Sequence, residues 1–149
     1  KRSDRKIAVA KRAGYFDAYF DSREPDMIER MRDATEGGFD VCFEVVGAES
    51  TLADCIHASR PGGTVVMIGN SMTETIPVNI NRAVLQEINL AGSVSCTREE
   101  FEGTIELIAK KVIDPEIYVT DIVPLDELQR TFERLTSSDD PILKAVVRP

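Results

Sequence analysis

Residues 37–50 have the sequence GGFDVCFEVVGAES, and this stretch decides the fold. Two glycines precede a short apolar run, and Gly47 ends the run just before residues that can begin a helix. Strands of parallel sheets have this continuous apolar character, because both faces of such a sheet are usually covered. The stretch therefore predicts a buried strand whose carboxyl end, at Gly47, presents backbone to a ligand.

The same pattern occurs again further along the chain. A turn is expected at residues 60–63, RPGG, followed by a second apolar strand at residues 64–69, TVVMIG. A helix is expected between the two strands, so the order is strand, helix, strand. This alternation predicts an α/β protein with a doubly wound parallel sheet. Ligands of such sheets bind at the carboxyl ends of the strands, where both Gly47 and Gly69 lie.

Apolar spacing, capping residues and turn residues predict the remaining elements. Helices are expected over residues 4–13, after the turn at 22–25, over 50–58, over 83–87, after the capping box at 97–100, and over 124–135. In the helix over 50–58, Ser50 or Thr51 is the expected cap, and Thr51 and Asp54 form an approximate capping box. Further strands are expected at residues 15–20, 88–94, 117–123 and 143–147. The chain then ends in a return helix and strand.

Length and composition narrow the class of protein. The 149 residues suit one domain or part of a larger protein, and the missing initial Met makes truncation an expectation. The net charge of -8 disfavours a nucleic-acid partner, because phosphate-binding surfaces need clustered cations. No apolar run approaches the roughly 18 to 20 residues that span a bilayer, and no signal peptide is recognisable. We therefore expect a cytoplasmic protein with no membrane partner.

Metal-binding and nucleophilic patterns are weak in this sequence. The cysteines Cys42, Cys55 and Cys96 have spacings that match no zinc or redox motif, so we expect free thiols. His57 is two residues from Cys55, a spacing that does not share one helical face. Glu44 is expected to hydrogen-bond backbone near the strand end, without a role as a general base. We predict no catalytic residue and no metal ligand in this chain.

Four segments together carry a resemblance to a known family. They are residues 4–14, DRKIAVAKRAG, residues 38–47, GFDVCFEVVG, residues 60–69, RPGGTVVMIG, and residues 144–149, KAVVRP. In order and spacing they resemble the C-terminal part of the medium-chain dehydrogenase/reductase family, in particular its zinc-dependent alcohol, polyol and threonine dehydrogenases. The resemblance implies a Rossmann-type sheet with an NAD(P) cofactor, an alcohol or polyol substrate, and zinc in the complete protein only.

The family's phosphate-binding pattern, G-x-G-x-x-G, does not occur in the 149 residues. The resemblance therefore implies an incomplete Rossmann sheet that lacks the first strand and the glycine-rich loop. Residues 1–120 would form a partial NAD(P)-binding domain, and residues 121–149 would pack on a catalytic domain that holds the zinc ligands. We expect the fragment alone to be inactive.

The resemblance also assigns cofactor contacts by position. The adenosine side would be lined by Val45, Val46 and Gly47, the nicotinamide by Ile68, Gly69 and Asn70, its carboxamide by Ser93 and Ser95, and the pyrophosphate by Lys144. A core strand with an ordinary glycine turn, and an ordinary surface lysine, are the alternatives. Lys1 and Arg2 fall where the family has its acidic ribose ligand, and cations there favour NADP over NAD. A shift in register would bring Asp4 there instead.

Three functions remain open at this point. The first is the cofactor-binding portion of an NAD(P)-dependent, zinc-dependent alcohol or polyol dehydrogenase. The second is a non-catalytic nucleotide-binding or oligomerisation module, and the third is a zinc-independent quinone or enoyl reductase of the same wider family. The resemblance also implies a homodimer or tetramer, with the strand near residues 88–94 joining the sheet of a partner.

Overall fold

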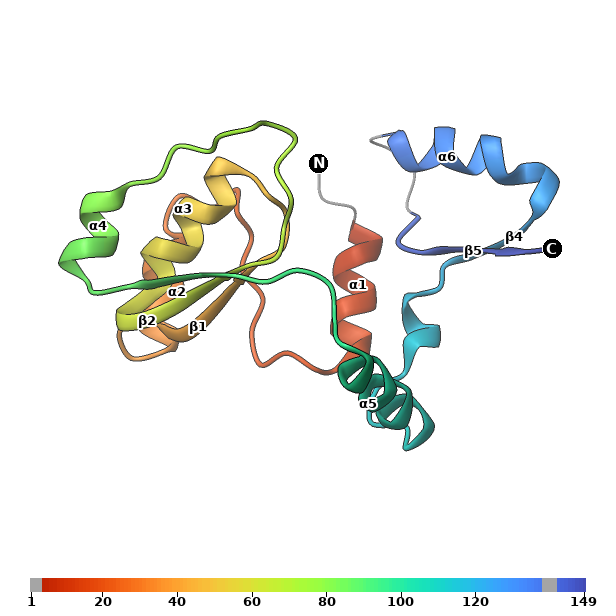
Figure 1. Cartoon of the computed structure of the whole chain (residues 1–149), viewed down its shortest axis with the longest axis horizontal. Coiled ribbons are helices and arrows are strands. Elements are labelled where there is room, and N and C mark those ends of the chain that lie inside the picture. The colour runs from red at the N-terminus through yellow and green to blue at the C-terminus, as the bar shows by residue number, and fades with distance from the viewer. Residues whose placement is uncertain (1–3, 138–141) are drawn as a thin grey trace. The chain divides into compact units, whose positions relative to one another are not determined.

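The computed structural model of the chain describes residues 4–137 and 142–149 (Figure 1). The chain divides into two compact units. One unit consists of residues 20–95, and the other combines residues 1–19 with residues 96–149. Within the described residues, no helix has the length and apolar character that crossing a membrane would need.

The unit of residues 20–95 is built around a parallel sheet. Its elements in chain order are α2 (Met27–Ala34), β1 (Phe39–Glu44), α3 (Glu49–Ala58), β2 (Ser59–Met67), α4 (Ile80–Leu85) and β3 (Asn89–Gly92). The strands lie in the order β1-β2-β3, and both pairs are parallel. The predicted α/β fold with a parallel sheet is confirmed. All three strands therefore have their carboxyl ends at the same edge of the sheet.

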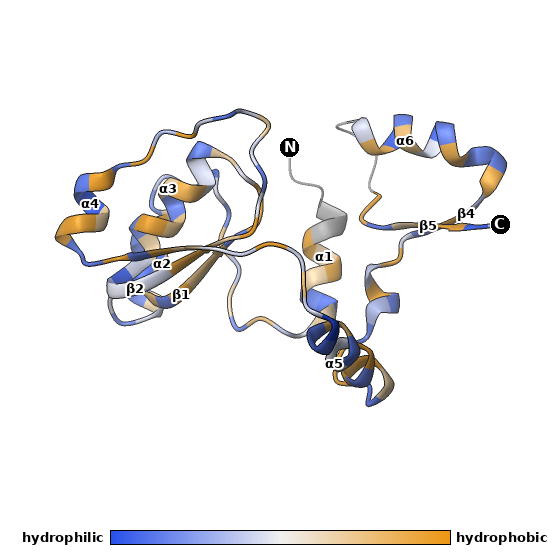
Figure 2. Cartoon of the chain, viewed as in Figure 1, coloured by the Kyte–Doolittle hydropathy of each residue, from blue (hydrophilic) through white to orange (hydrophobic). Residues whose placement is uncertain are grey.

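The core of this unit lies between α3, α4 and one face of the sheet. Its buried members are Leu52, Ile56, Val65, Ala83 and Ile88. Figure 2 shows apolar positions recurring between polar ones along α3 and α4, as expected for helices that bury one face. This core holds α3 against the strands, and α3 in turn positions the loop between β1 and α3.

The other unit contains mostly helical segments and one strand pair. Its elements are α1 (Asp4–Ala13), α5 (Arg98–Ala109), the 3-10 turns η1 (Pro115–Tyr118) and η2 (Leu125–Glu127), β4 (Asp121–Pro124), α6 (Leu128–Thr136) and β5 (Ala145–Arg148). β4 and β5 pair in parallel. α1 ends before Gly14, whose φ of 69° is the left-handed stop that the sequence predicts. The capping box of Thr97 and Glu100 begins α5, as predicted.

The strand expected at residues 15–20 is absent, and this prediction is wrong. The segment is a loop, because its aromatic side chains contact each other and other segments of the same unit instead of forming a sheet face. The Tyr19 hydroxyl donates to Ala10 O at 2.8 Å, and the Tyr15 hydroxyl accepts from Asp114 N at 3.1 Å. The rings of Phe16 and Tyr19 pack edge to face. The alternation of aromatic residues thus reflects contacts within this unit.

The predicted cap of α3 is also wrong. The helix begins at Glu49, and its N-cap residue, Ala48, has no side chain that can cap. The Thr51 hydroxyl donates to Glu44 Oε1 at 2.7 Å and lies 3.0 Å from Ala48 O. The Thr51 hydroxyl therefore hydrogen-bonds to a nearby carboxylate instead of capping the helix.

Strand boundaries differ from the prediction as well, and the differences are largest at β2 and β4. The turn expected at residues 60–63 lies inside β2, where the register with β1 shifts between Phe39 and Val41. A shift of this kind absorbs extra residues within a strand pair. The strand expected at 117–123 begins only at Asp121, because residues 115–118 form η1, whose first residue is Pro115.

Candidate functional site

The loops after β1 and β2 meet backbone to backbone. Ile68 N and Gly69 N donate to Glu44 O at 2.8 and 3.0 Å. A Cβ atom on Gly69 would overlap Gly47 N and would lie only 2.5 Å from Val46 N. A Cβ atom on Gly47 would likewise lie 2.8 Å from Ser71 N, and Gly47 has a φ of 79°. Both positions therefore need glycine, because any side chain would push the two strand ends apart.

The Glu44 carboxylate fixes the shape of the loop after β1. This residue is 3% exposed, and its side chain accepts hydrogen bonds from Val46 N and Gly47 N, both at 2.9 Å. Burial alone would raise the pKa of the carboxyl, but the Thr51 hydroxyl and the backbone N–H groups outweigh it and hold the pKa below its ordinary value. Glu44 therefore hydrogen-bonds backbone at the strand end, as predicted, and its lowered pKa favours the ionised form.

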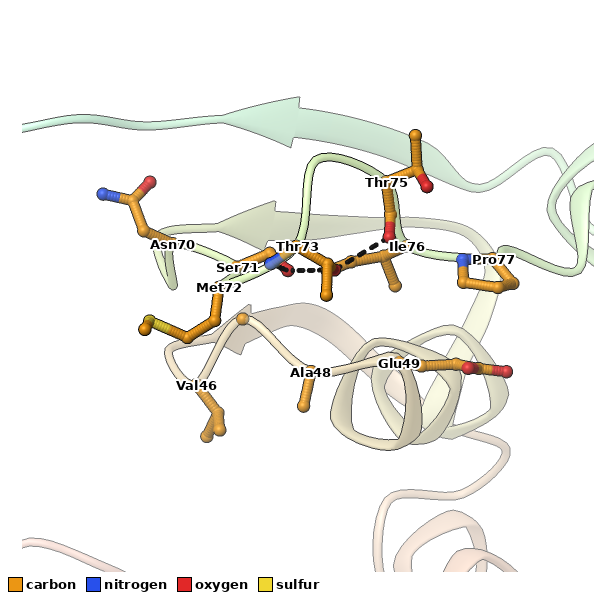
Figure 3. Close-up of a pocket in the computed structure, with 11 residues that line it drawn as sticks. Val46, Ala48, Glu49, Asn70, Ser71, Met72, Thr73, Thr75, Ile76 and Pro77 are labelled. Atoms are coloured by element: carbon orange, nitrogen blue, oxygen red, sulfur yellow. Dashed lines mark hydrogen bonds between the residues drawn. The ribbon is translucent and has the colours of Figure 1, made fainter.

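A pocket of about 550 Å³ lies beside the contact between the loops after β1 and β2 (Figure 3). One wall comes from the end of β1 and the first turn of α3, and the other comes from the loop after β2. The lining residues are Val46, Gly47, Ala48, Glu49, Asn70, Ser71, Met72, Thr73, Thr75, Ile76 and Pro77. They offer apolar side chains, hydroxyls and an amide, with Glu49 as the one charged group among them. Such a lining suits an uncharged part of a ligand better than a phosphate.

Hydroxyl groups hold the second wall of the pocket in shape. Ser71 Oγ and Thr73 Oγ1 share a hydrogen bond of 2.8 Å, and Thr73 N donates to Ser71 Oγ at 3.0 Å. Thr73 Oγ1 also donates to Thr75 O at 2.9 Å, and Figure 3 shows this chain of bonds along the loop. The loop is ordered by its own side chains although it contains no regular secondary structure between β2 and α4.

The structure brings most of the predicted site residues to one edge of the sheet. Val45, Val46 and Gly47 follow β1, while Ile68, Gly69 and Asn70 follow β2. Ser93 joins them, because Ser93 N donates to Met67 O at 3.0 Å just beyond β3. Ser95 lies two residues further on, with a φ of 58°.

Lys144 belongs to the other unit, where its carbonyl accepts from Thr120 N at 2.9 Å. Lys1 and Arg2 lie outside the described residues.

In the second wall of the pocket, sequence reasoning identified Asn70 but missed residues 71–77. Residues 71–77 carry Ser71, Thr73 and Thr75 but no helical or strand period, so they resemble an ordinary loop. Their position was the usable signal, because loops that follow parallel strands line the ligand-binding edge. The role of Thr51 was missed for a different reason. Its partner, Glu44, is seven residues away, beyond the range of capping motifs.

Zinc does not fit the described residues. They contain no group of three or more His, Cys, Asp or Glu side chains that could surround a metal ion. The Nδ1 atom of His57 lies 2.7 Å from Ala53 O within α3, so this nitrogen already has a backbone partner. The described part of the chain therefore supplies no set of ligands from which a metal-dependent step could be derived.

Comparisons with known proteins agree with this architecture. Residues 1–110 match the family model described as zinc-binding dehydrogenase. The chain is 29% identical over 128 residues to sorbitol dehydrogenase of Bacillus subtilis. This match covers 85% of this chain and 36% of that protein. It is 32% identical over 113 residues to a putative D-xylulose reductase of Rhizobium meliloti, covering 75% of this chain and 32% of that protein.

A solved structure shows the same fold over the whole chain. The crystal structure of 2R,3R-butanediol dehydrogenase from Bacillus subtilis matches with a TM-score of 0.84 at 24% identity, covering 100% of this chain and 42% of that one. At this identity the match shows the fold alone. The chain thus spans less than half the length of the proteins that it resembles.

Proposed function

Because the chain belongs to the family of zinc-binding dehydrogenases, we propose that the carboxyl edge of its sheet holds part of a nicotinamide dinucleotide. The family and the Rossmann-type fold agree with the sequence predictions, and the relatives that match this chain, such as sorbitol dehydrogenase, support an oxidoreductase. The proposed parent reaction is hydride transfer between NAD(P) and an alcohol or polyol. When bound, the cofactor accepts or donates the hydride, and the protein orients it.

The main support for this proposal is the close backbone contact between the loop after β1, at Gly47, and the loop after β2, at Gly69. It brings the ends of β1 and β2 together beside a pocket of about 550 Å³ whose lining is nearly uncharged. Val45, Val46 and Gly47 would contact the adenosine, because apolar side chains at a strand end can cover a flat ring. Val46 is 61% exposed and is therefore free to do so.

The remaining contacts concern the nicotinamide and the pyrophosphate. Ile68, Gly69 and Asn70 would flank the nicotinamide, and the backbone at Ser93 and Ser95 would hold its carboxamide. Lys144 would supply a positive charge to the pyrophosphate. Such backbone contacts orient a cofactor without taking part in bond making.

We further propose that this chain alone binds nucleotide weakly and does not turn over. The 149 residues contain no G-x-G-x-x-G loop, and backbone N–H groups of that loop normally hold the phosphates. Zinc and substrate would bind to other residues of a complete protein. Turnover of an alcohol by the isolated chain would contradict this proposal.

NADP is the cofactor we favour. Lys1 and Arg2 would attract the 2′-phosphate that distinguishes NADP from NAD. An acidic side chain at this position would instead bind the ribose hydroxyls of NAD and repel that phosphate. The expected result is a lower dissociation constant for NADPH than for NADH. Equal constants would remove the reason for preferring NADP.

A pair of matched variants tests the binding edge. Val46→Asp replaces an exposed apolar side chain at the proposed adenosine contact, and Val84→Asp makes the same change on exposed α4, outside the pocket. NADH and NADPH are titrated into isotope-labelled protein and followed by amide chemical shifts. We expect Val46→Asp to raise both dissociation constants about tenfold, the equivalent of roughly 1.4 kcal/mol.

Two results would contradict the proposed site. One is equal affinity of the Val46→Asp and Val84→Asp proteins for both nucleotides. The other is a set of shifted amides that excludes residues 45–47 and 68–70. Circular dichroism of both variants shows that a lost affinity does not come from unfolding.

A further inference from the structure

A second cavity of the unit of residues 20–95 contains two thiols. The cavity has a volume of about 260 Å³ and is lined by Met31, Phe39, Val41, Cys42, Phe43, Asp54, Cys55 and Ala58. Cys42 lies on β1 and Cys55 on α3, and both are half-buried and free. None of these residues lines the pocket at the carboxyl edge. The thiol cavity is therefore separate from the proposed cofactor site.

Ser59 connects the surroundings of the two cysteines. Its hydroxyl contacts the Cys42 sulfur and the Cys55 carbonyl, and both cysteines line the same cavity. Ser59 is fully buried, with its hydroxyl oxygen 2.8 Å from Cys55 O and 3.4 Å from Cys42 Sγ. The single Ser59 proton has two acceptors, Cys55 O and the Cys42 sulfur, and when it points to the sulfur it stabilises negative charge on that atom.

The surroundings of the two thiols differ in a way that favours the thiolate at Cys42. The hydrogen bond from Cys55 lowers the pKa of Cys42, against the burial that raises it, and the Ser59 hydroxyl lowers it further. The same contact raises the pKa of Cys55, as do burial and the charge of Cys42, with the Glu44 and Asp54 carboxylates adding to the effect. Cys42 is therefore the nucleophile of the pair, and Cys55 is the protonated neighbour.

We propose that peroxides oxidise Cys42 and Cys55, and that the two residues then form a reversible disulfide with each other. The Cys42 thiolate attacks one peroxide oxygen, the O–O bond breaks, and hydroxide leaves, so that Cys42 becomes a sulfenic acid. The Cys55 sulfur then attacks the Cys42 sulfur, and its proton leaves with the hydroxyl as water. In total, two thiols and one hydrogen peroxide give one disulfide and two waters.

The disulfide would close a ring of chain that contains the candidate functional edge. Residues 42–55 include the Glu44 carboxylate, Gly47 and Thr51, which together shape the loop after β1. Cross-linking β1 to α3 restricts the unfolded chain and so stabilises this loop. Oxidation is therefore expected to raise the melting temperature of the protein.

The test uses the full chain carrying Cys96→Ser, because Cys96 is exposed and would otherwise form disulfides between molecules. The protein is treated with a small excess of hydrogen peroxide and digested with a protease that cleaves after glutamate. Glu44 and Glu49 lie between the two cysteines, so the digestion separates them unless a disulfide links the peptides. We expect linked peptides, an intact mass lower by two hydrogens, and full reversal by a thiol reductant.

Single variants identify the attacking sulfur. In Cys55→Ser the Cys42 sulfenic acid is expected to persist and to react with a dimedone-type reagent. A Cys55→Ala variant removes the donor, so at a pH below the Cys42 pKa of about 6 alkylation of Cys42 should slow about tenfold, because the loss of one hydrogen-bond donor raises the thiol pKa by roughly one unit. In Cys42→Ser, Cys55 should stay reduced at the same dose.

Two outcomes would overturn the proposal. In the folded Cys96→Ser protein, one is the absence of linked peptides at a peroxide dose that oxidises Cys42. The other is the faster oxidation of Cys55 in the Cys42→Ser variant than of Cys42 in the Cys55→Ser variant. The first measurement needs neither variant at the paired cysteines, so poor folding of a variant leaves the result decisive.

Discussion

At the scale of single residues, two glycines do more than end their strands. Gly47 and Gly69 were predicted from their positions at strand ends, and the resemblance explained them by the approach of a cofactor. The structure adds a cause within the chain, since each glycine lies against the backbone of the other loop. Sequence could locate these residues, but the contact between them depends on how β1 and β2 pair.

Gly69→Ala is expected to destabilise the protein by about 1–3 kcal/mol. The added methyl group would overlap backbone atoms of Val46 and Gly47, and backbone cannot turn aside as a flexible side chain can. Gly92→Ala is the control, because a Cβ atom there meets no atom within 4 Å. Urea unfolding measures both variants, and equal stabilities would contradict the close packing of the loops.

Glu44→Gln tests the buried carboxylate. Its lowered pKa means that the ionised form stabilises the fold above the unfolded pKa of about 4.3, and this stabilisation is lost as the pH falls through the lower folded pKa. Glutamine presents an amide donor where backbone N–H groups also donate, at a cost of about 1–3 kcal/mol. The loss in unfolding free energy is expected at pH 7 and should become smaller below about pH 4.

The control for this measurement is Glu49→Gln, which changes an exposed glutamate in the first turn of α3. Its expected effect at pH 7 is at most about 1 kcal/mol, from the weaker interaction with the helix dipole. Unfolding free energies are compared across the pH range. A difference between wild type and Glu44→Gln that stays constant from pH 7 to strongly acidic pH would contradict the role assigned to Glu44.

At the scale of elements, local signals predicted α5 better than α3. The Thr97 and Glu100 box begins α5 as expected, because both partners lie within one helical turn. In α3 the Thr51 hydroxyl instead reaches a carboxylate on β1, and a tertiary contact of this kind carries no local sequence signature. The apolar stripe of α5 was also predicted, but none of its residues is buried.

Thr97→Ala is expected to weaken the first turn of α5. Removing the cap leaves Glu100 N without its side-chain acceptor and costs about 1 kcal/mol, which increases amide exchange near the start of the helix about fivefold. Thr104→Ala is the control, because that hydroxyl donates only to Glu100 O inside the helix. Hydrogen exchange followed by mass spectrometry compares them, and unchanged protection in Thr97→Ala would contradict the cap.

At the scale of the whole molecule, sequence predicted the parallel sheet, while the compact units come from contacts that sequence does not show. The structure separates residues 20–95 from the two flanking segments, whereas the predicted boundary after residue 120 followed from family resemblance. Contacts between distant segments define such units, and local patterns do not encode them. The packing of residues 121–149 on a catalytic domain stays a proposal.

The free edge of β3 raises the question of assembly. Among the described residues β3 pairs only with β2, and all four of its residues are exposed. Val94, just beyond the strand, is 85% exposed. An unpaired edge with apolar neighbours favours pairing with another chain, and a homodimer or tetramer formed there is the assembly that we propose.

Val94→Glu is expected to turn a dimer of this chain into a monomer, because two copies meeting at β3 would bring the new carboxylates together beside a dehydrated edge. Leu85→Glu is the control, since it adds the same charge at a highly exposed apolar position of α4. Sedimentation velocity at tens of micromolar protein measures all three proteins. A wild-type monomer at that concentration would contradict the proposed assembly, and an equal loss of dimer in both variants would place the contact elsewhere. A dimer that only Val94→Glu dissociates would instead mean that β3 extends the sheet across two chains.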